Sequence, residues 1–132
     1  LIVEANSGKI QIARAGHDAP LHYSSKTQNI NPINSPGIAI GIDSGDVFDK
    51  SINSMELNVE KGDILLLYTD GVNEASDIRG EEFGTDRLNK TLANTSGLGA
   101  EKVVKAIQNE VISFSGDVPQ NDDITLIAVE KI

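Results

Sequence analysis

The chain of 132 residues is long enough for one domain or for part of a larger one. Its net charge of −9 excludes the basic surface that non-specific nucleic-acid binding requires, and its lack of cysteine excludes disulfides and thiolate metal sites. No apolar run reaches the roughly 18–20 residues of a membrane-spanning helix, no signal peptide is recognisable, and we expect a cytoplasmic location.

The first residues, Leu1-Ile2-Val3, form an apolar run, although protein termini are usually polar and loosely ordered. We therefore expect residues upstream of Leu1 to complete the fold. An edge strand left open at this point would allow pairing with a second copy of the chain, so we expect that a homodimer can form.

Alternating apolar residues predict several strands in the first half of the chain, the first two as a β-hairpin. Residues 25–50 are rich in loop-forming residues, with an apolar island at 38–42 that we predict to be a short strand. The turn Lys61-Gly62-Asp63 is predicted to close a second hairpin. The predicted strands of this half are residues 1–5, 9–15, 21–24 and 54–59.

The central strand is predicted from five successive apolar residues, Ile64 to Tyr68. Such a run indicates burial on both faces, and its short length and flanking glycines favour a strand over a helix. The strand is followed by Asp70 and Gly71, so a carboxylate stands on a rigid element where solvent or a metal can reach it. A common Asp-Gly turn would have the same sequence.

Two helices and a last strand follow. Thr85 is predicted to cap a helix that buries Leu88 and Leu92. A second helix is predicted from about Ala100 to Phe114, and residues 124–129 predict the last strand. The order of elements indicates an α+β domain with a largely antiparallel sheet. The apolar stripe of the second helix consists of Val103, Val104, Ile107 and Val111.

Three carboxylates stand at predicted strand ends: Asp70 after the central strand, and Asp122 and Asp123 before the last one. If these strands are antiparallel neighbours, the exit of one meets the entrance of the other, and Asp70 faces Asp122. Neighbouring carboxylates repel each other, and a divalent cation removes the conflict. Oxygen ligands without cysteine favour Mg²⁺ or Mn²⁺ over zinc. The alternative is that all three are turn-forming residues that point into water.

Neither histidine has the sequence context of a catalyst. His17 follows a glycine in a loop, where local hydrogen bonding is the more common role, and His22 is predicted to lie at the surface of a short strand. No G-x-S-x-G sequence is present, and residues 80–84 lack the Gly-Lys-Ser/Thr ending of a phosphate-binding loop.

Five motifs follow one another along the chain. They are Ala15-Gly16-His17-Asp18-Ala19-Pro20-Leu21, Ala39-Ile40-Gly41-Ile42, the stretch from Gly62 to Ala75, Gly80-Glu81-Glu82-Phe83-Gly84-Thr85-Asp86-Arg87-Leu88, and Gln120-Asn121-Asp122-Asp123-Ile124-Thr125-Leu126. In this order they closely resemble the SpoIIE/RsbU-like serine phosphatases, the bacterial branch of the metal-dependent type 2C (PPM) protein phosphatases. The resemblance covers essentially the whole chain, and Leu-Tyr-Thr-Asp-Gly-Val and Asp-Asp-Ile-Thr are its most specific parts.

The resemblance implies an antiparallel β-sandwich flanked by helices, the α-β-β-α PPM fold, with residues 1–132 as the C-terminal portion of one phosphatase domain. It implies that Asp70 and Asp122 are catalytic metal ligands, with Gly71 and Asp123 beside them in the metal site and Asp123 in a supporting role. The implied cofactor is a pair of Mn²⁺ or Mg²⁺ ions. The implied reaction is hydrolysis of phosphoserine or phosphothreonine by a metal-activated water.

The resemblance also implies partners. The typical substrate in this branch is a phosphorylated anti-sigma-factor antagonist, a STAS-type protein, and an upstream sensor domain in the same polypeptide usually regulates the enzyme. The expected role is therefore in bacterial stress or sigma-factor signalling. A catalytically inactive docking or scaffold domain is the alternative, and the presence of Asp70 and Asp122 argues for the enzyme.

Two departures from the family pattern matter. The Gly-His motif usually reads Asn-Ala-Gly-His-Pro-Pro-Pro, whereas this chain reads Arg14-Ala15-Gly16-His17-Asp18-Ala19-Pro20, so we expect a loop of different shape. The metal-binding motifs of the family's N-terminal half would lie before Leu1. We therefore expect upstream residues to complete the two-metal site and the isolated fragment to be inactive.

Overall fold

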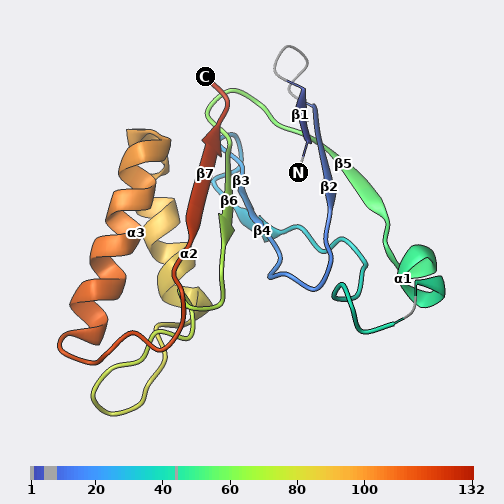
Figure 1. Ribbon diagram of the computed structural model, residues 1–132. Helices are drawn as coiled ribbons and strands as arrows, with labels where there is room; N and C mark the ends of the chain where they lie inside the picture. The colour runs from blue at the N-terminus through green and yellow to red at the C-terminus, as the bar shows by residue number, and fades with distance from the viewer. Residues whose placement is uncertain (1, 5–8, 44) are drawn as a thin grey trace.

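The computed structural model describes residues 2–4, 9–43 and 45–132, which form two antiparallel β-sheets and helices packed on one of them (Figure 1). The three-stranded sheet has the order β1-β2-β5, and the four-stranded sheet has the order β4-β3-β6-β7. The predicted α+β class is confirmed. The strands are β1 Ile2–Glu4, β2 Lys9–Ala13, β3 Leu21–Tyr23, β4 Ile30–Pro32, β5 Ser54–Asn58, β6 Ile64–Tyr68 and β7 Leu126–Glu130. The helices are α1 Asp46–Ser51, α2 Gly84–Thr95, the 3₁₀ helix η1 Ser96–Leu98 and α3 Ala100–Ser115.

Strand β6 lies inside the four-stranded sheet, between β3 and β7. Ile64 and Leu66 are fully buried in the core beneath the helices, whereas Leu65 is fully buried in a second core with residues of β2 in the other sheet. Successive side chains of a strand point to opposite faces, so a strand that is apolar throughout serves both cores. The predicted burial of this strand on both faces is confirmed.

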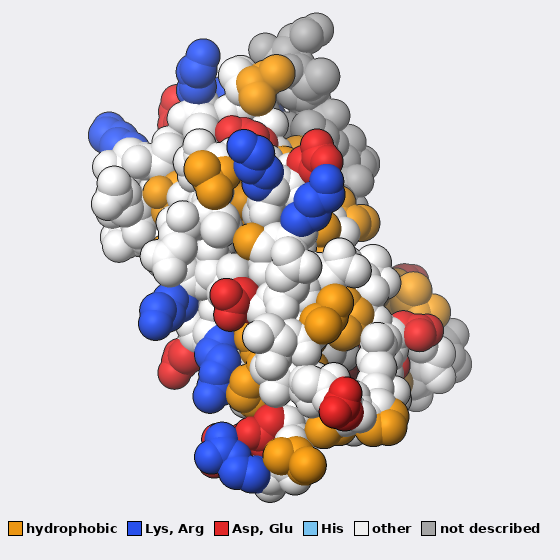
Figure 2. All heavy atoms as spheres, turned by 90° about the vertical axis from the view of Figure 1, so that its left-hand side faces the viewer, with side chains coloured by type: hydrophobic (Ala, Val, Ile, Leu, Met, Phe, Trp, Pro, Cys, Tyr) orange, Lys and Arg blue, Asp and Glu red, His pale blue; other side chains and the backbone are white. Residues whose placement is uncertain are grey.

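Helices α2 and α3 cover the outer face of the four-stranded sheet (Figure 1). Their buried residues recur at four-residue spacing, and each contributes about 1.5–3 kcal/mol through burial. The exposed faces carry charged side chains of both signs (Figure 2). No helix in the described ranges has the length and apolar character needed to cross a membrane. Val104, predicted on the buried stripe, is only partly buried. The buried residues are Leu88 and Leu92 on α2 and Val103, Ile107 and Val111 on α3.

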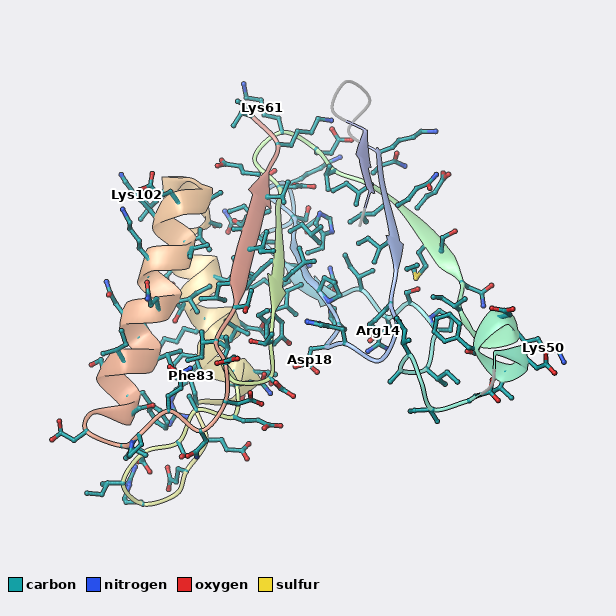
Figure 3. All side chains as sticks on the ribbon, viewed as in Figure 1. Arg14, Asp18, Lys50, Lys61, Phe83 and Lys102 are labelled. Carbon is teal, nitrogen blue, oxygen red and sulfur yellow. The ribbon has the colours of Figure 1, made fainter. Side chains whose placement is uncertain are left out.

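The start of α2 differs from the prediction. The helix begins at Gly84, Thr85 lies inside its first turn, and no side chain caps its N-terminus. Phe83, only 1% exposed, holds this end instead through an edge-to-face contact with Phe114, with ring centroids 5.6 Å apart (Figure 3). The guanidinium of Arg87 lies 4.6 Å from the centre of the Phe114 ring. In place of a side-chain cap, the amides of Phe83 and Gly84 donate to the carbonyls of Ala75 (2.7 Å) and Asn73 (2.8 Å), and the contacts with Phe114 pack this end of the helix on α3.

The segment between β4 and β5 also differs from the prediction. Residues 38–42 form no strand, and two of their isoleucines are 79% and 73% exposed. Gly41 has a φ of +89°, which interrupts an extended backbone. The chain then enters α1, a helix that the sequence analysis missed. The carboxylate of Asp43 accepts hydrogen bonds from the amides of Val47 and Phe48. An Asp just before a helical segment is a sequence signal for the start of a helix.

The turn Lys61-Gly62-Asp63 carries the chain from one sheet to the other, so the prediction of a second hairpin is wrong. Strand β5 pairs with β2, while β3 and β7 pair with the two edges of β6. Because both edges of β6 are occupied, β5 cannot join it.

Asp63 fixes this crossing between the sheets. Its carboxylate is 3% exposed and accepts hydrogen bonds from the amides of Ser25 (2.8 Å) and Glu60 (2.9 Å) and from the Ser25 hydroxyl (3.0 Å). His22, predicted at the surface, is only partly exposed, and its Nε2 lies 3.0 Å from Asp63 Oδ2. Burial works to raise the pKa of Asp63, but these hydrogen bonds together hold it below its ordinary value of 3.8.

We expect Asp63→Asn to lower the free energy of unfolding by about 1–3 kcal/mol near neutral pH, because charge-assisted hydrogen bonds are lost. The pKa of Asp63 is lower in the folded state, so its stabilisation is present above pH 3.8 and is lost as the pH falls through the folded pKa. The difference between wild type and variant should therefore shrink in acid. Urea unfolding of both proteins near neutral pH and again below pH 3.8 measures the difference in the free energy of unfolding. The exposed Asp117→Asn is the control variant. An equal difference at the two pH values would contradict the stabilising role of the Asp63 carboxylate.

Candidate metal centre

Asp70, Asp122 and Asp123 lie at one end of the four-stranded sheet, where β6 ends and β7 begins. The two strands are antiparallel neighbours, as predicted, and the last pair of their register is Tyr68 with Leu126. Antiparallel pairing sets the exit of β6 beside the entrance of β7. The three carboxylates therefore lie at the ends of two adjacent strands rather than within one local turn.

Hydrogen bonds continue between the two segments beyond the ends of the strands. The amide of Thr69 donates to the carbonyl of Thr125 at 3.2 Å, and the Thr69 hydroxyl donates to the carbonyl of Asp123 at 2.7 Å. The amide of Thr125 donates back to the Thr69 hydroxyl at 2.9 Å. This exchange fixes the backbone immediately before Asp70 against the backbone of Asp123.

Gly71 completes this contact because it has no side chain. A Cβ at this position would lie 2.7 Å from the carbonyl oxygen of Asp123 and 3.2 Å from that of Asp122, closer than folded backbones tolerate. The residue is buried. Only glycine lets the segment after β6 lie directly on the segment before β7, which gives Gly71 a packing role at the site.

The three carboxylates are exposed, and their hydrogen bonds are local. Asp70 accepts from the amide of Gly71 at 3.0 Å, and Asp122 accepts from the amide of Asp123 at 2.6 Å. No Lys, Arg or His of the described ranges forms an ion pair with them. Oxygen atoms of three anions at one edge suit a hard divalent cation such as Mg²⁺ or Mn²⁺.

The described residues do not form a complete metal site. Nowhere in the described ranges do three or more His, Cys, Asp or Glu side chains gather closely enough to hold a metal ion by themselves. The donor type therefore fits a hard cation, whereas the number of ligands falls short of the two-metal site that the motifs imply.

A second loop reaches the same end of the molecule. Arg14 donates to the carbonyls of Ser35 (3.1 Å) and His17 (2.8 Å), which fixes the loop that carries His17 and Asp18. Figure 3 shows Arg14 and Asp18 at the end of the sheets opposite Lys61. His17 is exposed and has a local contact with the carbonyl of Asp18, as expected.

This loop and the ends of β6 and β7 enclose a cleft of about 200 Å³, lined by Arg14, His17 and Asp18 together with Tyr68 and Thr69. Burial, with a smaller effect from the negative charge of Asp18, raises the pKa of the Tyr68 hydroxyl. In the sequence, Arg14 and Asp18 stand out only as departures from the family motif. The arginine directly before Ala15-Gly16-His17 was the available signal.

Comparison with known proteins decides the family. The model of the family described as stage II sporulation protein E (SpoIIE) matches residues 1–131. The chain belongs to the SpoIIE family. It is 32% identical over 131 residues to protein IcfG of Synechocystis sp., and 29% identical over 119 residues to the phosphoserine phosphatase RsbU of Bacillus subtilis. These regions cover 98% and 90% of this chain but only 20% and 34% of the two relatives.

Solved structures share the fold of this SpoIIE-family chain. The PP2C phosphatase domain of SpoIIE from Bacillus subtilis, determined with a fragment of its regulatory domain, has a TM-score of 0.75 at 15% identity and covers 97% of this chain and 35% of that one. The RsbU and RsbW domains of a Mycobacterium tuberculosis protein also give 0.75, at 21% identity, over 97% of this chain and 34% of that one. The SiaA PP2C domain of Pseudomonas aeruginosa gives 0.73 at 22% identity, over 92% and 47%. The predicted PPM phosphatase fold is confirmed.

We expect Gly71→Ala to separate the two strand ends and to lower the free energy of unfolding by about 1–3 kcal/mol, because its Cβ would overlap the Asp123 carbonyl. Chemical denaturation measures the effect. The matched control is Gly97→Ala, where a Cβ meets nothing within 4 Å and stability should be nearly unchanged. Equal stability of the two variants would show that Gly71 is not needed for this contact.

Proposed function

We propose that this chain forms part of a metal-dependent protein phosphatase that hydrolyses phosphoserine or phosphothreonine. The observation that carries the proposal is the contact of Thr69 and Gly71 with Asp123, which gathers three carboxylates without cationic partners among the described residues at one sheet edge. Membership of the SpoIIE family and similarity to the phosphoserine phosphatase RsbU support the reaction class.

In this proposal Asp70 and Asp122 hold Mn²⁺ or Mg²⁺ through carboxylate oxygens, Asp123 supports them, and Gly71 keeps the two segments together. Such ions, when bound, neutralise phosphoryl charge and lower the pKa of water, which makes it a nucleophile near neutral pH. The role of the described residues in this proposal is to position anionic ligands on two paired strand ends. The hydrogen bonds of Thr69 to Asp123 and Thr125 limit how far these ends can move apart.

We propose that further oxygen ligands come from outside the described residues. Two hard cations need more ligands than three carboxylates provide, because each binds about six oxygens, some of them from water. The fact that this chain spans 20% and 34% of the length of IcfG and RsbU is consistent with this proposal.

The substrate we propose is a phosphorylated anti-sigma-factor antagonist of the STAS type, in a cytoplasmic sigma-factor signalling pathway with a sensor domain in the same polypeptide. The motif resemblance and the RsbU-like sequence support this proposal. The edge position of β1 in the three-stranded sheet supports the proposal that two copies can pair there.

Asp70→Asn in the full-length protein should lower Mn²⁺-dependent kcat/KM for a phosphoserine substrate by about 100-fold or more, since a neutral amide is a poor ligand for a hard cation. Unfolding by denaturant should be unchanged, because the Asp70 side chain is exposed. Asp117→Asn, an exposed carboxylate outside the site, is the activity control. Near-normal turnover by the purified Asp70→Asn protein would contradict the assignment of Asp70 as a metal ligand.

Residues 1–132 alone should bind Mn²⁺ only weakly, with a Kd of about 0.1–1 mM, and should show negligible phosphatase activity, because the described carboxylates form no group that holds a metal ion by itself. Calorimetric titration and a phosphoserine assay with excess Mn²⁺ measure the two quantities. Tight binding of two ions, or robust turnover, would show that the residues of this chain suffice.

A further inference from the structure

A groove of about 460 Å³ lies beside the candidate metal centre, between the loop after β6 and the C-terminal end of α3. Gly71 and Asp122 form its inner end. One wall is the loop after β6, residues 74–82, and the other is the end of α3 with the loop that leads to β7. Both loops extend past the end of the sheet in Figure 1. A chain segment lying in this groove would thus run directly to the edge that carries Asp70 and Asp122.

The wall formed by residues 74–82 is held in one conformation by its own hydrogen bonds. The Asp77 carboxylate accepts from the amides of Arg79 (2.8 Å) and Glu81 (3.0 Å) and from the Arg79 guanidinium (2.9 and 3.0 Å). Ser76 and Glu82 pair across the loop as an antiparallel bridge. A preordered wall loses little conformational entropy when a partner binds, which is a property of recognition surfaces.

The opposite wall contains an accessible apolar patch among polar residues. It presents Ile112, whose side chain is 60% exposed, with partly buried Val118 and exposed Pro119. These residues offer contact to an apolar side chain of a bound segment. They do not explain by themselves which segment the groove selects.

The charge of the groove is one-sided. Glu74 and Glu82 line it and are exposed, Asp122 stands at its inner end, and no Lys, Arg or His is among its lining residues. Neither glutamate forms an ion pair with any residue that the structure describes. Nor do these carboxylates form a metal-binding group of three or more, so a second cation site is not indicated in the described ranges. A basic side chain complements this surface.

We propose that this groove binds the polypeptide segment next to the phosphorylated serine of a protein substrate, and that Glu74 and Glu82 select a segment with Lys or Arg beside an apolar residue. The inference rests on the proposed phosphatase function and specifies its substrate class. Because Gly71 and Asp122 line the groove and belong to the candidate metal centre, a segment that lies in the groove continues directly to a phosphoserine held at that centre.

The experiment compares three substrates of the full-length protein with Mn²⁺: a phosphoserine peptide with flanking lysines, the same peptide with alanines, and p-nitrophenyl phosphate. The wild type should prefer the lysine peptide by about tenfold in kcat/KM, with a preference that shrinks at high salt. Glu74→Gln with Glu82→Gln should remove this preference and leave the other two rates unchanged. Glu81→Gln is the matched control, since this glutamate is on the same loop, pairs with Arg79 at 3.2 Å and does not line the groove.

A binding assay separates the failure of this inference from the failure of the proposed function. Fluorescence anisotropy of the two labelled peptides is measured on Asp70→Asn protein, with and without the glutamate changes. Tighter binding of the lysine peptide that depends on the glutamates supports the groove even when no protein shows turnover. Equal binding of the two peptides, or measurable turnover that is equal for both, overturns the inference. Loss of p-nitrophenyl phosphate hydrolysis in the glutamate variant also overturns it, because the glutamates would then belong to the metal site.

Discussion

The pairing of β6 with β7 is the constraint on which the candidate site depends. Hydrogen bonding between the strands continues through Thr69 and Thr125, and Gly71 then allows the following backbone to lie on Asp122 and Asp123. β6 is buried on both faces, so its end cannot shift without disturbing two cores. The carboxylates are exposed, but the backbone that carries them is as fixed as the centre of the sheet.

Local sequence was sufficient wherever one physical requirement determined the pattern. The short, glycine-flanked apolar run at Ile64 to Tyr68 favours a strand buried on both faces, and the four-residue repeat of α3 favours burial of one helix face. The predicted antiparallel pairing of β6 with β7 is confirmed, and it sets the end of β6 beside the start of β7; that Asp70 and Asp122 share a cation there stays a prediction. The family motifs added the chemical role, which no periodicity contains.

The errors concern features that long-range contacts decide. The turn at Lys61-Gly62-Asp63 has the sequence of a hairpin, yet β3 and β7 already occupy both edges of β6. His22 reads as a surface residue because its partner, Asp63, is 41 positions away. Thr85 reads as a cap, but the contact of Phe83 with Phe114 fixes that end of α2. In each case the competing interaction is invisible in a window of a few residues.

The charge of the molecule sets a condition on how any phosphorylated protein can approach it. A phosphoserine carries about −1.5 to −2 charges at neutral pH, and it meets a chain of net charge −9 at an edge with three carboxylates. Coulomb repulsion therefore opposes binding of the phosphoryl group until cations offset the local charge. A basic flank is subject to the opposite force, because the carboxylates of the groove attract it whether or not the edge is neutralised. Recognition of the flank and acceptance of the phosphoryl group are thus electrostatically separate, and in an acidic protein the flank is the part of the substrate that can bind first.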